Sequence, residues 1–143
     1  MEFNYFDTLH RAQKAYTRML EPICRRWELT RNELDVLLFL YNNPELNRAA
    51  DIVSHRGMAK SHVSLSVSNL EHRGLLFCRK DPSDRRTVHL ELAGEAGEIA
   101  RAGQEAQKAF FSRIHRGVTP EEFVLWRSVS QKISGNIQSM ETE

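Results

Sequence analysis

The chain has 143 residues, a typical length for one domain, so we expect residues 1–143 to form a single domain. Hydrophobic residues make up 41% of the sequence and charged residues 27%, the proportions of a folded soluble protein. No apolar run approaches the roughly 18 residues of a membrane span, and the N-terminus lacks the features of a signal peptide. We therefore expect a cytoplasmic protein without a membrane partner.

The formal net charge is +1, but the charges are distributed unevenly. Between His55 and Arg86, seven lysines and arginines stand against three acidic residues. A basic segment between mildly acidic flanks is typical of a protein that holds an anionic partner at its centre.

The sequence has no motif of an enzyme or a metal site. Cys24 and Cys78 lie outside any C-x-x-C pattern, and the six histidines form no i, i+4 pair. Phosphate loops, nucleophile elbows and paired-carboxylate motifs are also missing from the sequence. We expect no metal, no cofactor and no enzymatic activity.

The first predicted helix covers about residues 3–27. Its apolar residues recur at helical spacings, and the pattern resumes after Pro22, which we expect to bend the helix without ending it. Thr30 and Glu33 form a capping box that predicts the start of a second helix, which ends before Pro44.

A short helix over about residues 47–55 and a turn at Gly57 precede a fourth helix in "KSHVSLSVSNLEHRG". Gly74 predicts a left-handed stop for this helix. Its buried stripe consists of Val63, Val67 and Leu70. The opposite face and its edges carry mostly small hydrogen-bonding side chains instead of the long charged ones of ordinary solvated helices: Ser61, Ser64, Leu65, Ser68, Asn69 and His72.

Two strands follow, "LLFCRK" and "TVHLEL", joined by "DPSDRR". In the second strand the alternation predicts that Val88, Leu90 and Leu92 point inward. The residues predicted to point outward are Thr87, His89 and Glu91. A long helix is expected from the end of this strand to about residue 116, and a final helix begins at the Thr119 capping box.

Three helices followed by a two-stranded hairpin are the arrangement of a winged helix-turn-helix, here over residues 30–92. The expected fold is mainly α-helical with a small β-hairpin wing, flanked by helical regions over residues 1–28 and 94–143. In this fold the helix after the turn enters the major groove of DNA, and the tip of the hairpin reaches the minor groove.

The residue types of the two elements suit those two grooves. Short polar side chains let a helix approach base edges, and Leu65 suits a thymine methyl group. Arginines suit a narrow minor groove, where negative potential is concentrated. We expect Asp84 to pair with the Arg86 side chain and hold it extended, and Pro82 to stiffen the loop.

The run "RGLLFCRKDPSDRRTVHLELAGEAG" resembles the MarR family of bacterial transcriptional regulators. The resemblance implies that Arg86 enters the minor groove with Asp84 as its positioning partner, and that the fourth helix reads bases. Leu65 and Asn69 differ from the arginines that are frequent at these positions in the family. The full set of expected DNA-binding residues is Lys60, Ser61, His62, Ser64, Leu65, Ser68, Asn69, Asp84, Arg85 and Arg86.

The family further implies a homodimer, in which the terminal helices of two chains interlock on a palindromic operator in double-stranded DNA. The aromatic stripes of the first and last helices support an interface independently of the resemblance. The family also implies a small-molecule effector, whose pocket would be lined by Tyr16, Trp27 and Phe39, although core packing explains these three residues equally well. Cys24 is either a redox sensor or, as we favour, a structural cysteine.

Two alternatives remain open at this point. A serine-rich helix face and two loop arginines also occur on ordinary solvated surfaces. A winged helix that serves only protein–protein contacts would bind DNA weakly and without sequence preference, whereas a regulator located on the bacterial nucleoid would bind one palindrome selectively.

Overall fold

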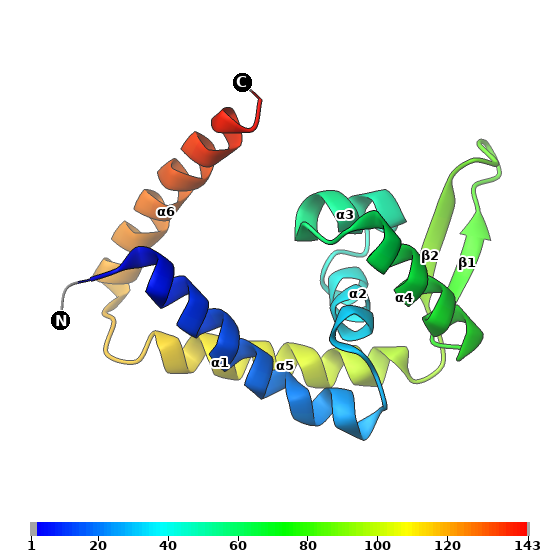
Figure 1. Ribbon diagram of the computed structural model, residues 1–143, viewed down its shortest axis with the longest axis horizontal. Helices are drawn as coiled ribbons and strands as arrows, with labels where there is room; N and C mark the ends of the chain where they lie inside the picture. The colour runs from blue at the N-terminus through cyan, green and yellow to red at the C-terminus, as the bar shows by residue number, and fades with distance from the viewer. Residues whose placement is uncertain (1–2, 143) are drawn as a thin grey trace. The chain divides into compact units, whose positions relative to one another are not determined.

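A computed structural model describes residues 3–142, which fold mainly into helices with a two-stranded antiparallel hairpin (Figure 1). The chain divides into two compact units, one ending at Phe110 and one beginning at Phe111. The helices and strands are, in chain order, α1 (Tyr5–Arg26), α2 (Arg31–Asn42), α3 (Ala49–Arg56), α4 (Lys60–His72), β1 (Leu76–Lys80), β2 (Val88–Leu92), α5 (Ala96–Ile114) and α6 (Pro120–Met140). Among the described helices, none is both long and apolar enough to cross a membrane.

The predicted helices are confirmed, with small differences at their starts. The first helix begins two residues later than predicted because Asn4 caps it, its side-chain oxygen accepting a bond from the Asp7 amide at 3.1 Å. It continues through Pro22, as expected. The third helix begins at Ala49, because Asp51 accepts a hydrogen bond from the backbone amide of Arg48 at 3.0 Å.

The capping box of α2 forms as predicted. The Glu33 amide donates to the Thr30 hydroxyl at 3.1 Å, and the Glu33 carboxylate accepts from the Thr30 amide at 3.2 Å. Gly57 and Gly74 both adopt left-handed backbone conformations, with φ of 61° and 72°, and end α3 and start the turn after α4. These local signals therefore set the lengths of the helices around the turn.

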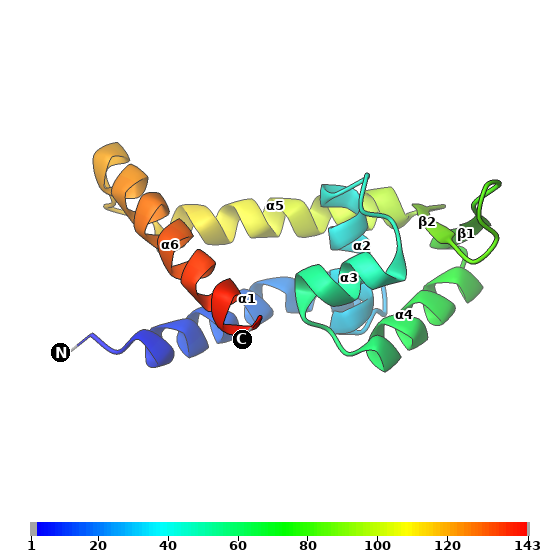
Figure 2. The same cartoon turned by 90° about the horizontal axis from the view of Figure 1, so that it is seen from above.

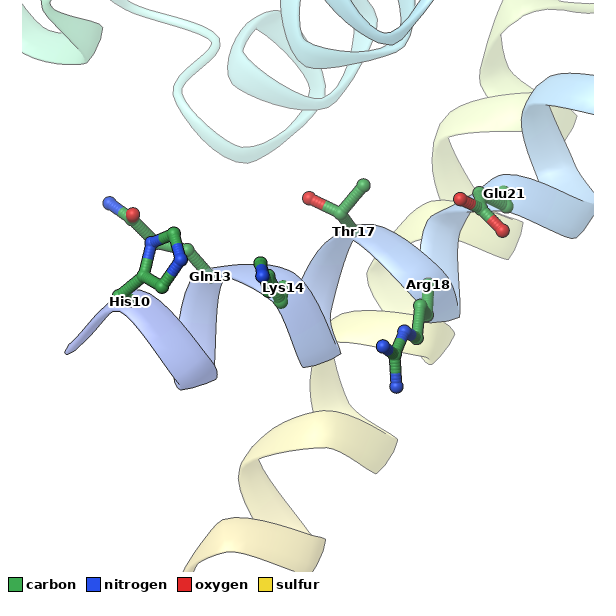
Figure 3. A pocket seen from close by; sticks show the side chains of 6 residues that line it. All are labelled: His10, Gln13, Lys14, Thr17, Arg18 and Glu21. Carbon is green, nitrogen blue, oxygen red and sulfur yellow. The ribbon is translucent and has the colours of Figure 1, made fainter. Parts of the chain in front are cut away.

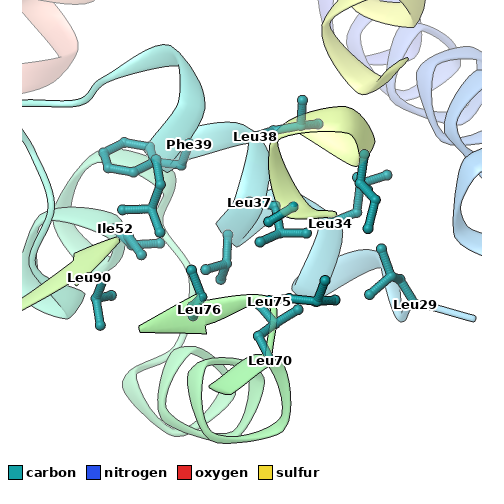
Figure 4. Close-up of a cluster of buried hydrophobic side chains, with 14 of the residues drawn as sticks. Leu29, Leu34, Leu37, Leu38, Phe39, Ile52, Leu70, Leu75, Leu76 and Leu90 are labelled. Carbon is teal, nitrogen blue, oxygen red and sulfur yellow. The ribbon is translucent and has the colours of Figure 1, made fainter. Parts of the chain in front are cut away.

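The hydrophobic core of the first unit is built around α2, whose side chains are buried on several sides (Figure 4). Leu34, Leu37 and Leu38 contribute from α2, with Ile52 from α3 and Leu70 from α4. Each buried leucine contributes about 1.5–3 kcal/mol through its removal from water. The buried face of α4 therefore packs against the apolar side chains of α2 and α3.

The hairpin is antiparallel and pairs Leu76 with Leu92 and Cys78 with Leu90. Leu90 is buried and Glu91 is exposed, as the alternation predicts. His89 differs from the prediction: its side chain is only 21% exposed, because its ring is hydrogen-bonded to groups outside its own strand. The reason is tertiary, since an alternating pattern does not reveal what lies beside a strand.

The second unit contains the end of α5 and all of α6. The ring of His115 lies against three aromatic rings of this unit, with centroid separations of 6.2 Å to Phe111, 5.1 Å to Phe123 and 5.3 Å to Trp126. The Thr119 capping box starts α6 as predicted. Many apolar side chains of α6 remain exposed: Phe123, Val124, Leu125, Trp126, Val129, Ile133, Ile137 and Met140.

Candidate nucleic-acid interface

The face of α4 opposite the core is open. Val63 and Leu70 are fully buried and Ser66 is nearly so, which fixes the rotation of the helix about its own axis. Leu65 is 62% exposed on this face. The predicted recognition residues on this helix are all exposed: Lys60, Ser61, His62, Ser64, Leu65, Ser68 and Asn69.

The C-terminal end of α4 is tied to the junction between α1 and α2. The guanidinium of Arg73, the C-cap residue of α4, donates to the carbonyl oxygens of Trp27 at 2.6 Å and Glu28 at 2.8 Å. Glu28 adopts a left-handed conformation with φ of 53°, which is uncommon for a residue with a side chain. These bonds hold α4 in a fixed relation to the end of α1.

The N-terminal end of α4 lacks a side-chain cap. Its N-cap is Ala59, which offers no side-chain acceptor to the amides of the first turn. Lys60 is exposed beside these amides. Open amides and a positive side chain at a helix N-terminus are suited to a phosphate group.

The loop between β1 and β2, residues 81–87, is shaped by two aspartates. Asp81 accepts hydrogen bonds from the Ser83 amide at 2.8 Å and from the Ser83 hydroxyl at 2.6 Å. Asp84 accepts from the Arg86 amide at 3.0 Å and from the Thr87 hydroxyl at 3.2 Å. The expected pairing of Asp84 with the Arg86 guanidinium is not the contact observed, because the carboxylate binds the backbone of the turn.

Arg85 and Arg86 are exposed at the tip of this loop. Among residues 3–142, no ion pair involves either of them or Lys60. By contrast, Arg79 lower in the hairpin is paired with Glu91 at 2.9 Å. The cations at the tip are therefore available to an external anion.

A side-chain bridge connects the base of the loop to the helices. His89 Nδ1 lies 2.6 Å from Asn47 Oδ1, and His89 Nε2 lies 2.7 Å from Asp81 Oδ2. The bond to His89, followed by those to Ser83, holds the pKa of the Asp81 carboxyl well below its usual range. The sequence does not reveal this bridge, because Asn47 is 42 residues from His89 and no pattern links it to the hairpin.

The three aromatic residues predicted to line an effector pocket occupy different surroundings. Tyr16 accepts a hydrogen bond from Gln107 at 2.7 Å and packs against Phe110. Trp27 lies under the guanidinium of Arg26, and Phe39 is buried. All three residues are part of the hydrophobic core or pack against it, so core packing accounts for their positions without a ligand.

A separate polar hollow of about 410 Å³ lies along α1 (Figure 3). None of the three predicted aromatic residues lines it. Its lining combines three basic side chains with one acidic and two neutral polar ones: His10, Gln13, Lys14, Thr17, Arg18 and Glu21.

Both cysteines are free thiols. Burial raises the pKa of the Cys24 thiol, and burial together with Glu71 raises the pKa of Cys78 to about 11. A raised pKa reduces the thiolate fraction, which is the reactive form. These surroundings favour the structural interpretation of Cys24.

Comparison with known proteins gives consistent results. Residues 27–87 match the family model described as the MarR family. The curated regulator YdgJ of Bacillus subtilis strain 168, an uncharacterized HTH-type transcriptional regulator, is 22% identical over 113 residues, which cover 79% of this chain and 68% of that protein.

Solved structures share the fold. A putative MarR family regulator from Listeria monocytogenes, complexed with 26mer DNA, has a TM-score of 0.82 at 14% identity, covering 96% of this chain and 90% of that one. The S. aureus MepR–DNA complex has a TM-score of 0.77 at 17% identity, covering 94% and 99%. For BpsR of Bordetella bronchiseptica the TM-score is 0.69 at 20% identity, covering 94% and 96%. In sequence this chain is thus similar to the MarR family over residues 27–87 and to a curated HTH-type transcriptional regulator, and it shares its fold with MarR family regulators.

Proposed function

We propose that two copies of this chain form a homodimer that binds a palindromic operator in double-stranded DNA and thereby regulates transcription. The observation that carries this proposal is that one compact unit presents an open small-residue helix face and, on its hairpin, two arginines without an ion-pair partner among the described residues. The two surfaces correspond in chemistry to the two grooves of DNA.

In this proposal α4 lies in the major groove. Ser64, Ser68 and Asn69 offer hydrogen-bonding groups on short side chains, and Leu65 supplies an apolar contact for a thymine methyl group. The open amides at the start of α4 and Lys60 bind the flanking phosphates, which fixes the register of the helix. Ser61 and His62 belong to the same exposed first turn.

The hairpin loop then lies over the neighbouring minor groove. Arg86 enters the groove and Arg85 follows the backbone, because a narrow groove attracts guanidinium groups. The role of Asp84 is to shape the turn from which Arg86 projects, since its carboxylate binds the Arg86 amide.

The homodimer is formed by the terminal helical regions. Apolar residues are exposed near the start of α1, at Phe6 and Leu9, and along α6, at Trp126, Ile133 and Ile137. Exposed apolar stripes of this size favour burial against a second copy. A two-fold dimer places two recognition helices about one turn of DNA apart, or roughly 10 base pairs.

We also propose that a small acidic molecule modulates DNA binding. The hollow is lined by one face of α1 and contains Lys14 and Arg18, whose positive charges suit an acidic group. The DNA binding of BpsR is regulated by 6-hydroxynicotinic acid, which makes this aromatic acid a suitable first probe. The pocket of Tyr16, Trp27 and Phe39 is the competing location, and Lys14→Ala and Tyr16→Phe variants distinguish the two in a calorimetric titration.

Because its partner is chromosomal DNA, we place the regulator in the bacterial cytoplasm, on the nucleoid when bound. The competing function is a winged helix used only for protein contacts. Selection of bound fragments from genomic DNA, followed by titration of the selected site and a scrambled site at several salt concentrations, distinguishes the two. We expect the selected site to bind at least about 10³-fold more tightly. Equal, steeply salt-dependent affinities for both sites would instead support the protein-contact module.

A further inference from the structure

His89 occupies an unusual position for a polar residue of an edge hairpin. It lies on β2, opposite Arg79 on β1, whose guanidinium is already paired with Glu91. The imidazole is 21% exposed, and each of its two nitrogens faces an oxygen of a different segment, at 2.6 Å and 2.7 Å. One ring thus contacts both the loop of the hairpin and the helical part of the unit.

The helical contact is firmly held. Asn47 lies in the connection between α2 and α3, and its backbone carbonyl accepts a hydrogen bond from the Leu90 amide at 2.7 Å. The next residue, Arg48, is fixed by Asp51 through both its backbone amide and its guanidinium. His89 is therefore bonded to a segment that is itself anchored on the core through α3.

The bond from His89 to Asp81 is connected through further hydrogen bonds to the part of the loop that carries Arg85 and Arg86. Asp81 binds His89 through one oxygen and both groups of Ser83 through the other. The Asp81 amide also donates to the carbonyl of Thr87 at 2.9 Å, which closes the base of the loop. Movement of Asp81 would consequently move the segment that carries Arg85 and Arg86.

We propose that His89 is the positioning residue of the wing, setting the direction of Arg85 and Arg86 by connecting Asp81 in the loop to Asn47 beside α3. This inference rests on the proposed function in DNA binding. An isolated two-stranded hairpin is only marginally ordered in water, so its direction must come from contacts with the rest of the unit. The core packing of Leu76 and Leu90 and the Leu90–Asn47 backbone bond hold the base of the hairpin, and the His89 bridge adds a connection that reaches the loop.

The first experiment measures coupling on DNA. His89→Phe keeps an aromatic ring but removes both nitrogens, and it is measured in the natural chain and in a chain carrying both Arg85→Ala and Arg86→Ala. We expect a loss of affinity of roughly 3- to 10-fold in the natural chain, the cost of ordering one or two loose side chains, and a loss of less than about 2-fold once the arginines are gone. Equal losses in both chains, or no loss in the natural one, would overturn the proposal.

The second experiment uses no DNA, so it separates this inference from the proposed function. Backbone ¹⁵N order parameters are measured for residues 83–86 of the free protein. In His89→Phe we expect them to fall toward the values below about 0.6 that characterise flexible backbone. The control, Glu91→Ala, removes the cross-strand partner of Arg79 but leaves the His89 bridge, so its loop should remain as ordered as in the natural chain.

Two further variants test the same bridge in case His89→Phe fails to fold. Asn47→Ala and Asp81→Ala remove the bridge from its two ends while the imidazole stays in place, and both should loosen the same residues. Unchanged order parameters in His89→Phe and in both of these variants would overturn the proposal. A natural protein that binds no DNA would overturn the proposed function, while the order parameters would still decide whether His89 fixes the loop.

Discussion

The carboxylate of Asp84 accepts a hydrogen bond from the backbone amide of Arg86 at 3.0 Å. It thereby stabilises the turn from which the arginine projects, and a second oxygen binds the Thr87 hydroxyl. The aspartate and the arginine of the hairpin tip are thus related through the backbone. This relation changes what each substitution should do.

Arg86→Ala should weaken operator binding and make the plot of log affinity against log salt shallower by about 1, because one positive charge is lost from the contact with DNA. Asp84→Ala removes a negative charge near DNA but loosens the turn. If the turn dominates, affinity falls despite the gain in net positive charge, and the fall disappears in the Arg86→Ala background. A double-mutant cycle, with affinities measured by fluorescence anisotropy at several salt concentrations, gives the coupling between the two substitutions. Tighter binding by Asp84→Ala in both backgrounds would identify the aspartate as an ordinary loop charge.

Asn69→Ala should reduce affinity for the operator by about 1–3 kcal/mol and leave binding to random DNA nearly unchanged, because a base contact carries sequence information. Lys60→Ala is the matched control on the same helix. Because Lys60 is proposed to contact phosphate, this substitution should lower the affinities for operator and random DNA to a similar degree. If Asn69→Ala lowered the affinities for operator and random DNA equally, the side chain would be a backbone contact.

Light scattering should give about twice the chain mass of 16.6 kDa. Ile133→Glu should shift the protein toward the monomer, because it places a charge in the exposed apolar stripe of α6. Gln131→Glu adds the same charge at a polar position of α6 and should leave the dimer intact. A natural chain that stays monomeric at micromolar concentration would contradict the proposed assembly.

Gly103→Ala should destabilise the fold by about 1–3 kcal/mol. A β-carbon at this position would lie 2.6 Å from Leu38 Cδ2, and Leu38 is almost completely buried in the core. Gly97→Ala, in the same helix, meets no atom within 4 Å and should be neutral or stabilising by up to about 1 kcal/mol. Urea unfolding of the two variants provides the comparison, and a destabilised Gly97→Ala would contradict the helix-propensity argument.

Asp81→Asn should lower stability at pH 5, and the difference from the natural chain should shrink as the pH falls below about 4. The folded-state pKa of Asp81 is depressed, mainly by His89, so its contribution is present above the unfolded-state pKa and is lost in more acidic solution. Denaturant titrations between pH 3 and 5 test the sign. A difference that grew toward low pH would show that Asp81 is not stabilised as a carboxylate.

Local chemistry alone predicted the helices around the turn. The Thr30 capping box, Gly57 and Gly74 determine where chain segments start and stop whatever surrounds them, because they satisfy or redirect the backbone within a few residues. The period of Val63 and Leu70 likewise predicted which face of α4 would be open. The open face of α4 and the exposed position of the loop arginines could therefore be predicted from the sequence.

Tertiary structure alone decided how the wing is attached to the helices. Asn47, Asp81 and His89 meet because the hairpin folds back beside the α2–α3 connection, and contacts over such sequence separations leave no periodic signal. The alternation of β2 placed His89 outward, and the neighbouring segment then covered it. The partner of Asp84 is instead a local matter, because an aspartate in a turn accepts a hydrogen bond from the backbone amide two residues on, here that of Arg86. What lies beyond the reach of the sequence is the contact between segments that only the fold brings together.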